Sequence, residues 1–253
     1  MASKRAVFVA PFDELADPRL LARLAHRAEE LGWDGFFVWD HITYSPPTSG
    51  ILDPWIVLAA IAMTTERVTI GPMVTPLSRR RVHKLARETA TLDRLSDGRF
   101  IMGVGLGSDR HGELAPFGEV TEPKQRAALL DEGLDELVRF WDGAFVPRPV
   151  QRPRIPIWCA ATYPNRRPLR RAARWDGLFP VRVPDPDALA EMAAETAAHR
   201  APDAGPFDLA ITVKPGHDVA PWEAAGATWT LTEFDSTPKL DAVRAAIEAG
   251  PRG

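Results

Sequence analysis

The sequence predicts an α/β protein folded as a closed (β/α)8 barrel, or TIM barrel, with residues 1–253 in a single domain. Short apolar segments alternate with longer helical patterns eight times along the chain. The connections between these units are too short for a second domain, and an unbroken series of this kind is typical of a closed parallel barrel. An open, doubly wound sheet is the alternative, but the glycines of "GVGLGSDRHG" lack its G-x-G-x-x-G spacing.

The first four units carry the clearest start and stop signals. Asp17 and Asp53 each precede a proline, and an acidic N-cap followed by proline is a strong helix start. Gly32 and Gly98 follow two of the helical patterns, and glycine commonly ends a helix. The expected strand and helix pairs are 5–10 with 17–32, 35–39 with 53–66, 67–74 with 81–98, and 99–107 with 123–142.

The second half of the chain repeats the alternation in shorter units. Apolar segments such as "IPIWCAA" and "GLFPV" have the length of buried parallel strands, and each precedes a helical pattern. The expected pairs are 155–161 with 164–175, 177–181 with 185–199, 209–213 with 221–225, and 228–232 with a closing helix from about 238.

Composition restricts the class of protein. With 45% hydrophobic and 26% charged residues, and no apolar run near the ~20 residues that cross a bilayer, the chain is predicted to be soluble. The N-terminal segment "MASKRAVFVAPF" lacks the features of a secretory signal, so the cytoplasm is the expected location. A net charge of −3 disfavours a general nucleic-acid binder, and the single Cys159 disfavours a disulfide or zinc framework. We therefore expect no nucleic-acid, membrane or metal partner.

In a barrel of this kind the residues that follow the strands meet at one open end, the mouth, where barrel enzymes place their chemistry. The first five strand ends hold one acid and one histidine, without a His-x-His pattern, so a metal-dependent hydrolase is disfavoured. Glycine, small polar and apolar groups predominate there, which suits a large planar cofactor with its own reactivity. The candidate residues are Ala10, Pro11, Phe12, Asp40, His41, Met73, Val74, Thr75, Gly105, Gly107, Ser108, Ala161 and Thr162.

His41 and Asp40 are the candidate catalytic residues. A histidine at the mouth can donate or accept a proton near neutral pH, although it can also simply hydrogen-bond the backbone. Asp40 is expected to fix the tautomer of the histidine or to cap the next turn. His111 and Glu113 fall in the loop after the fourth strand, where either can meet a substrate.

Arginine clusters follow two of the strands. Arg166 and Arg167 begin a helix just past the fifth strand, where their side chains and the free N–H groups can bind a phosphate, and Asn165 can cap that helix or join the site. The cluster at 79–81 is either a solvated face or an anion site. Cys159 falls inside a strand and is expected to be a small buried hydrophobic residue.

Three segments together resemble a known family. "AEELGWDGFFVWDH", "GPMVTPLSRRRVHKLARETATLDRLSDGRFIMGVGLG" and "LRRAARWDGLFP" are similar to the luciferase-like flavin-dependent oxidoreductases, over residues 5 to about 181. That family includes bacterial luciferase, FMN-dependent monooxygenases, and dehydrogenases and reductases that use coenzyme F420. The resemblance implies a (β/α)8 barrel, an isoalloxazine or deazaflavin ring across its mouth, and a homodimer.

The resemblance also assigns roles to individual positions. His41 matches the histidine beside the flavin ring, and Met73–Val74 matches the site of a non-prolyl cis peptide behind the ring. Gly105, Gly107 and Ser108 match positions near the ring and the ribityl chain. Residues 161–167 match the phosphate loop, but this chain has "AATYPNRR" where the family often has Gly-Gly and a serine. The long insertion that often covers the substrate is expected to be reduced here.

The resulting leading interpretation is a monooxygenase that uses FMN, reduced by a separate flavin reductase, and dioxygen on a small organic substrate. A dehydrogenase or reductase that uses coenzyme F420 is the alternative within the class, and the arginine clusters can meet the acidic tail of that cofactor. The alternative of another class is a flavin-binding relative without turnover, which the short chain and the altered phosphate loop favour.

Overall fold

The computed structural model describes residues 2–251, and within them nine parallel strands form one sheet in the order β3-β2-β1-β9-β8-β7-β6-β5-β4. The two ends of this sheet, β3 and β4, are consecutive in the chain, and β3 also bridges to the segment before β5 through Ile70 and Phe100. The sheet therefore closes on itself, which confirms the (β/α)8 barrel. The strands are β1 (Lys4–Val9), β2 (Gly35–Val38), β3 (Thr69–Pro72), β4 (Thr75–Pro76), β5 (Met102–Gly105), β6 (Ile157–Thr162), β7 (Gly177–Val181), β8 (Asp208–Val213) and β9 (Trp229–Glu233).

The third strand differs from the continuous segment 67–74 that the sequence predicts. It is divided into β3 and β4, and the peptide bond between Met73 and Val74, which lies in the gap, is cis, as the resemblance implies. Pro72 and Pro76 lie on either side of the gap and have no N–H group for the ladder of hydrogen bonds. Counted as one interrupted strand, β3 and β4 complete the set of eight strands.

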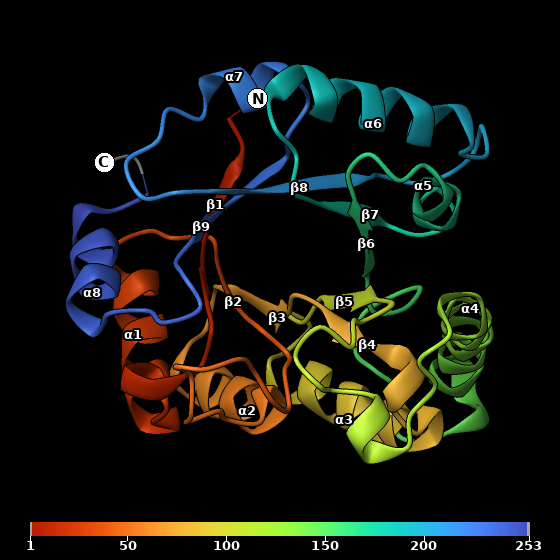
Figure 1. Cartoon of the computed structure of the whole chain (residues 1–253), viewed down its shortest axis with the longest axis horizontal. Coiled ribbons are helices and arrows are strands. Elements are labelled where there is room, and N and C mark those ends of the chain that lie inside the picture. Colours follow the sequence, from red (N-terminus) through yellow and green to blue (C-terminus); the bar gives the residue numbers. More distant parts are fainter. Residues whose placement is uncertain (1, 252–253) are drawn as a thin grey trace.

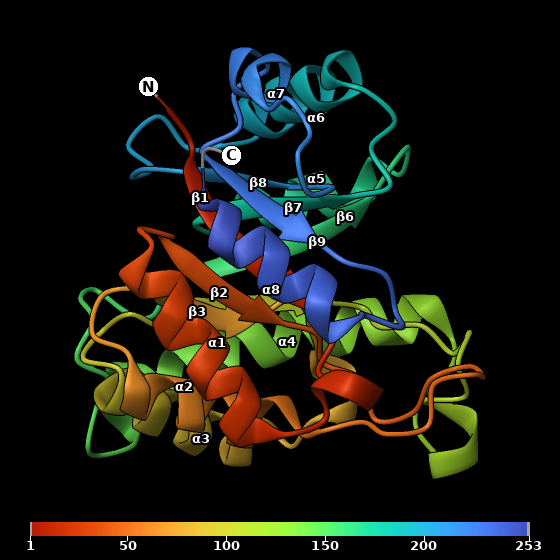
Figure 2. The same ribbon diagram turned by 90° about the vertical axis from the view of Figure 1, so that its left-hand side faces the viewer.

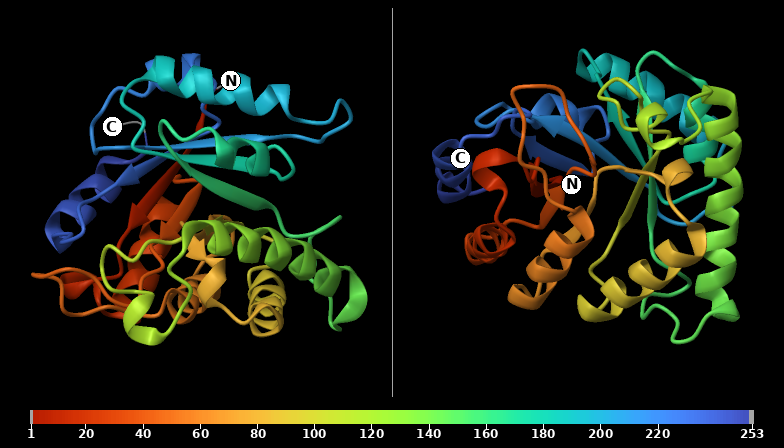
Figure 3. Two further views of the ribbon diagram at one scale, coloured as in Figure 1. Left: turned by 45° about the vertical axis from the view of Figure 1, so that its right-hand side comes forward. Right: turned by 60° about the horizontal axis from the view of Figure 1, so that its bottom comes forward.

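Helices follow the strands and lie outside them (Figures 1 and 3), so each of the eight predicted units has its strand and its helix. The α-helices are α1 (Pro18–Glu30), α2 (Pro54–Thr64), α3 (Val82–Leu95), α4 (Pro123–Arg139), α5 (Arg167–Ala172), α6 (Pro186–Ala198), α7 (Ala220–Ala224) and α8 (Leu240–Ala249). Short turns of 3-10 helix, η1 (Asp13–Leu15), η2 (Leu77–Arg79) and η3 (Ala115–Phe117), lie in the connections, and a π turn, Phe140–Ala144, ends α4. None of the helices within residues 2–251 is both long and apolar enough to cross a membrane.

An acid followed by proline starts four of the helices. The carboxylates of Asp17, Asp53, Glu122 and Asp185 accept backbone N–H groups in the first turns of α1, α2, α4 and α6. The proline at the next position needs no hydrogen-bond acceptor in that turn. These local signals explain why the helix starts are readable from the sequence.

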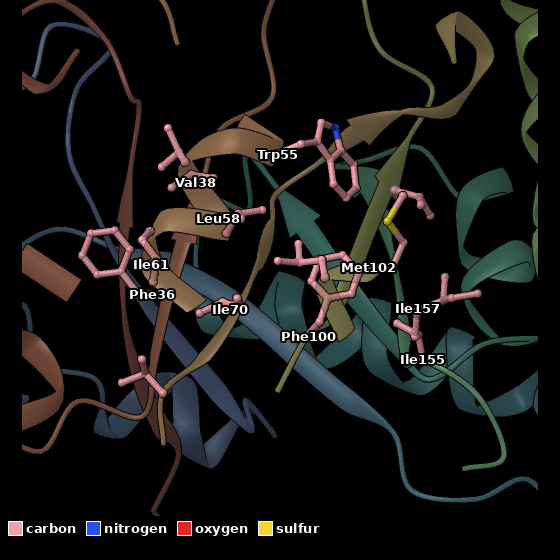
Figure 4. Packing of buried hydrophobic residues seen from close by; sticks show 14 of the residues in the cluster. Phe36, Val38, Trp55, Leu58, Ile61, Ile70, Phe100, Met102, Ile155 and Ile157 are labelled. Atoms are coloured by element: carbon pink, nitrogen blue, oxygen red, sulfur yellow. The ribbon is translucent and has the colours of Figure 1, made fainter. Parts of the chain in front are cut away.

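Alternating side chains of the strands build two apolar regions. Outward-facing residues pack against the helices, and Figure 4 shows part of this contact between α2 and the strands β2 and β3. Inward-facing residues fill the barrel and are called the lumen cluster. Its buried members are Ala6, Phe8, Phe37, Met73, Ile101, Trp158, Phe179, Ala210, Trp229 and Leu231, with Trp39, Val74, Ala160 and Val181 partly buried against them.

Helix α8 completes the outer ring beside α1 (Figures 1 and 2). Arg27 of α1 bonds the carboxylate of Glu248 on α8 through two nitrogens, at 2.8 Å each. Cys159 of β6 belongs to the apolar region that packs against the helices, and burial raises its pKa to about 12, consistent with its expected role as a small buried residue.

The seam where the third strand meets β5 leaves no room for side chains at two glycines. A Cβ atom on Gly71 would collide with the carbonyl oxygen of Ile101, and one on Gly103 would collide with that of Pro72. Both oxygens belong to the backbone, so the strands themselves would have to move apart. We expect Gly103→Ala to lower the free energy of unfolding by about 1–3 kcal/mol, measured by urea denaturation.

The matched control is Gly205→Ala, because a Cβ atom at Gly205 meets nothing within 4 Å. This substitution should leave the free energy of unfolding within about 0.5 kcal/mol of the wild type. Equal stability of the two variants would show that the seam is not closely packed at Gly103.

Candidate active site

Two loops come together at the carboxyl ends of the strands. In Figure 2 the arrows of β2 and β9 point to the right, and the loops after β2 (orange) and β5 (yellow-green) extend at that end. The two loops are joined by hydrogen bonds: Thr43 donates to the carbonyl oxygen of His111, and the backbone N–H of Ile42 donates to Glu113. The predicted mouth therefore carries an ordered pair of loops rather than independent ones.

Asp40 is buried and fully engaged by donors. Its carboxylate accepts from Thr75 Oγ1 at 2.8 Å, from Arg79 at 2.8 Å and from Arg80 at 2.7 and 2.9 Å. Arg79 also donates to the backbone carbonyl of Asp40 at 3.0 Å. The expectation that Asp40 fixes the tautomer of His41 does not match these contacts, since its carboxylate is directed to the two arginines and Thr75.

Glu113 takes the place next to the histidine. One of its carboxylate oxygens accepts from Arg79 at 2.8 Å, and the other lies 2.9 Å from His41 Nδ1. Burial by itself would raise the pKa of Glu113, but the hydrogen bond with His41 and the charges of His41 and Arg79 lower the pKa below its ordinary value. Glu113 is therefore a carboxylate at neutral pH, and it holds His41 with Nδ1 protonated.

Two carboxylates and two arginines form a buried set of compensating charges. The side chains of Asp40, Arg79 and Glu113 are 0%, 3% and 2% exposed, and that of Arg80 is 19% exposed. We call these four residues the ion network. Their formal charges sum to zero, so the cost of removing each charge from water is offset by its partners.

His41 lies at the accessible end of the ion network. Its side chain is 24% exposed, and within residues 2–251 its Nε2 atom has no hydrogen-bond partner, while Nδ1 is taken by Glu113. The rings of Phe12, Trp39 and Tyr44 surround it at centroid distances of 5.9, 5.7 and 5.1 Å. His41 thus presents one free ring nitrogen from a rigid, aromatic setting.

His111 closes the same cluster from the other loop. Its ring stacks on Tyr44 at 3.9 Å, and its Nδ1 atom lies 2.8 Å from the hydroxyl of Ser45. Burial, followed by the charge of His41, lowers the pKa of His111, so its ring is neutral at pH 7. Of the two loop residues expected to meet a substrate, Glu113 is instead buried under His41, and His111 packs against Tyr44.

The lumen side of the mouth has a floor of small residues. A Cβ atom on Gly105 would lie 2.7 Å from Val74 Cγ2 and 3.5 Å from Ala160 Cβ, which places these three positions side by side. The indole nitrogen of Trp39, which packs against the lumen cluster, is buried without a hydrogen-bond partner in the described chain. A floor of small residues and an unsatisfied N–H donor that border the same lumen cluster fit a flat ring with polar edge atoms.

The loop after β5 is held by an arginine from α4. Arg126 donates to the carbonyl oxygens of Leu106 and Gly107, at 3.2 and 2.7 Å, and is itself buried. Ser108 is exposed, and its hydroxyl accepts from the backbone N–H of Arg110 at 3.1 Å. The backbone that follows the glycine-rich strand is therefore fixed close to the floor.

The expected phosphate segment is arranged differently from a free arginine site. Arg166 is paired with Glu191 and Glu195 of α6, at 3.0 and 2.9 Å, and Arg167 is exposed. Asn165 Oδ1 accepts the backbone N–H of Arg167 at 3.2 Å, as a residue at a helix start does. Ala161 is buried and Thr162 is exposed at the end of β6. The role of residues 161–167 in phosphate binding stays a prediction.

The structure brings together some of the predicted residues and leaves others apart. Asp40 and Thr75 join the ion network, whereas Phe12 and its buried neighbour Pro11 lie beneath His41. No hydrogen bond or ion pair within residues 2–251 links segment 161–167 to this group. The sequence interpretation missed Glu113 as the partner of His41 and Arg79 as the link between Glu113 and Asp40, although both residues follow strand ends.

Metal chemistry finds no support in the donor set. Among residues 2–251 no group of three or more His, Cys, Asp or Glu side chains is arranged to hold a metal ion. The carboxylates of Asp40 and Glu113 are instead paired with arginines.

Comparison with known proteins gives relatives along most of the chain. An uncharacterised protein of Mycobacterium bovis is 32% identical over 247 residues, which cover 83% of this chain and 85% of that protein. An F420-dependent glucose-6-phosphate dehydrogenase of Amycolatopsis mediterranei is 39% identical over 128 residues, or 49% of this chain and 38% of that enzyme.

Solved structures with the same fold include enzymes of two cofactor classes. An F420-dependent secondary alcohol dehydrogenase matches with a TM-score of 0.71 and 19% identity, over 99% of this chain and 85% of that one. The oxygenating component of 3,6-diketocamphane monooxygenase from Pseudomonas putida, solved with FMN, matches with a TM-score of 0.70 and 17% identity, over 85% and 67%. The sequence pattern of the luciferase-like monooxygenases matches residues 6–229. The chain therefore belongs to the luciferase-like monooxygenase family of flavin- and F420-dependent oxidoreductases.

Proposed function

We propose that this protein is an oxidoreductase that uses the deazaflavin coenzyme F420 to move a hydride to or from a small organic substrate. The observation that carries the proposal is His41: its Nε2 has no hydrogen-bond partner among residues 2–251, and its Nδ1 is held by the carboxylate of Glu113. A group of this kind suits a reaction in which the cofactor supplies the hydride chemistry and the protein supplies the proton.

The choice of F420 follows from the curated relatives. The relatives that match about half of the chain include F420-dependent glucose-6-phosphate dehydrogenases, at 39%, 35% and 37% identity. The matched stretches span less than half of those enzymes, so glucose 6-phosphate is not carried over as the substrate. An acidic cofactor tail also suits exposed arginines such as Arg167 and Arg182 near the ends of β6 and β7.

A monooxygenase that uses reduced FMN and dioxygen is the second candidate. It is supported by the shared fold of the FMN-bound 3,6-diketocamphane monooxygenase, whose cofactor also has a flat tricyclic ring. In that case a separate flavin reductase would be the partner. The homodimer that the resemblance implies stays a prediction, and so does a flavin-binding role without turnover.

The residues of the mouth have separable tasks under this proposal. Val74, Gly105 and Ala160 provide the surface on which a ring can lie, and the N–H of Trp39 can donate to a polar ring edge. The free Nε2 of His41 holds a proton or accepts one at the reacting centre. Glu113 keeps the ring oriented, which is a positioning role.

Cofactor binding is the first test. Titration of the purified protein with F420, followed by absorbance and fluorescence, should show saturable binding with one site per chain. Gly105→Leu should weaken that binding strongly, because the added side chain would occupy the floor beside Val74. The control Gly205→Leu lies in an exposed loop and should bind as the wild type does. If neither F420 nor FMN binds, the proposed function must be abandoned.

His41 gives the second test. His41→Ala should keep the affinity for cofactor but reduce cofactor turnover with alcohols and carbonyl compounds by on the order of 10²–10⁴-fold, since a positioned acid or base is lost. His83 on α3 is exposed and provides the matched control, His83→Ala, which should be fully active. Wild-type turnover in His41→Ala would contradict the assignment, and a wild type inert to the whole panel would favour the binding protein without turnover.

Glu113 gives a test through stability. Its pKa is lowered in the folded protein, so its contribution to stability is complete above the ordinary value of 4.5 and is lost as the pH falls through the lowered value. At pH 7 we expect Glu113→Gln to cost about 3 kcal/mol of unfolding free energy, because Arg79 loses one buried partner.

The pH dependence shows whether the loss of stability in Glu113→Gln comes from the missing charge of Glu113. The difference in unfolding free energy between the wild type and Glu113→Gln should be constant from pH 7 down to about 4.5 and shrink below it. Urea denaturation at a series of pH values measures it. A difference that does not change on acidification would mean that the charge of Glu113 is not what stabilises the loops.

A further inference from the structure

Strand β9 brings a carboxylate into the barrel at its open end. Trp229 and Leu231 belong to the lumen cluster, and alternation along the strand places Glu233 on the same side. The register agrees, because Glu233 pairs with Phe8, another member of that cluster. Glu233 is the last residue of β9, so its side chain enters the lumen at the mouth.

Glu233 has few charged neighbours. The lumen cluster, to which β1 contributes Phe8, consists of uncharged residues. The charged groups that face Glu233 follow the ends of β8 and β9: Lys214 Nζ lies 4.0 Å from the Glu233 carboxylate and 3.2 Å from that of Asp235. Lys214 therefore lies closer to Asp235, whose side chain is 84% exposed, than to the lumen carboxylate.

This setting changes the acidity of the carboxyl group. Burial raises the pKa of Glu233 above its ordinary value of 4.5, and the opposing effects of Lys214 and of a hydrogen bond with Thr212 do not cancel the rise. Its side chain is still 28% exposed, so water and small molecules reach it. A partly buried carboxyl group of this kind exchanges its proton closer to neutral pH than a surface glutamate does.

Space for a ligand lies next to the same group. Glu233 lines a pocket of about 260 Å³ at the carboxyl ends of β8 and β9, together with Lys214, Pro215 and residues between Phe234 and Ala242 that lead into α8; His41 and the floor residues do not line it. In the sheet, only β1 lies between β9 and β2, the strand that leads to His41. The carboxyl group and the imidazole therefore stand on neighbouring parts of one mouth, on opposite sides of β1.

We propose that Glu233 is a second proton-exchanging residue of this site, acting on substrates whose reacting group is a hydroxyl or carbonyl. The inference rests on the proposed function. In carbonyl reduction, Glu233 in its acid form would donate its proton to the carbonyl oxygen, and bound reduced F420 would supply the hydride to the carbonyl carbon and be oxidised. The C=O π bond is replaced by one C–H and one O–H bond, Glu233 is left as a carboxylate, and the reverse sequence oxidises an alcohol.

The experiment is a carbon NMR titration of the glutamate carboxyl groups, with and without saturating F420. Glu233→Gln identifies the signal, and thermal unfolding shows that this near-isosteric variant is folded. We expect Glu233 to titrate above 4.5 in the free protein, and its proton affinity to rise at least about tenfold when the cofactor displaces water from the mouth. Glu233→Gln should also bind F420 normally while kcat for alcohols and ketones falls by on the order of 10²-fold or more.

The control is Asp241→Asn, which removes a carboxylate of α8 that is 98% exposed and pairs with Arg244 rather than with Lys214. This variant should keep both kcat and the response of Glu233 to the cofactor. A Glu233 signal that ignores bound F420, or a Glu233→Gln variant with wild-type kcat, would overturn the inference while leaving the proposed function intact. Absence of F420 binding in the same titration would instead overturn both.

Discussion

The bridge that Arg79 forms between Asp40 and Glu113 is the contact on which the arrangement of the mouth depends. One guanidinium group joins the segment after β2, the turn η2 after the divided third strand, and the loop after β5. Each of these charges is almost completely removed from water, so none is stable there without its partners. Arg79 therefore fixes two loops relative to each other, and the position of His41 follows because Glu113 is held on its other side.

This constraint explains why the apolar strand β2 ends in an acid and an imidazole. The side chain of Asp40 points away from the lumen. Its carboxylate oxygens accept hydrogen bonds from Thr75, Arg79 and Arg80. His41, one residue later, emerges at the mouth with a ring that is oriented but not enclosed. Asp40 anchors the chain where it leaves the barrel wall. This anchor fixes the position of His41, the next residue. Asp40 therefore supports the site through the backbone and the arginines.

The sequence allowed the fold to be predicted because its signals are local. Acid-proline starts and terminal glycines mark helices within a few residues, and apolar segments mark the strands, so all eight units were recognisable. The break in the third strand was not predicted by pattern alone, because the segment 67–74 reads as one apolar strand; only the resemblance pointed to Met73–Val74. The partners of His41 and Arg166 could not be predicted, since Glu113 lies 72 residues from His41 and the glutamates on α6 are 25 and 29 residues from Arg166.

Because the ion network is neutral, it contributes orientation to the mouth rather than a net charge. Lys214 and Asp235 likewise compensate each other at the rim. Under the proposed function, the charge that a bound ring or substrate meets would be set mainly by the protons of His41 and Glu233, which lie on either side of β1. A hydride transfer changes the charge of the substrate by one unit, and a proton must move with it to restore neutrality in a site of low polarity. The fixed charges at the mouth cancel, so only the protons on His41 and Glu233 change its net charge. This arrangement suits the coupled transfer of a hydride and a proton.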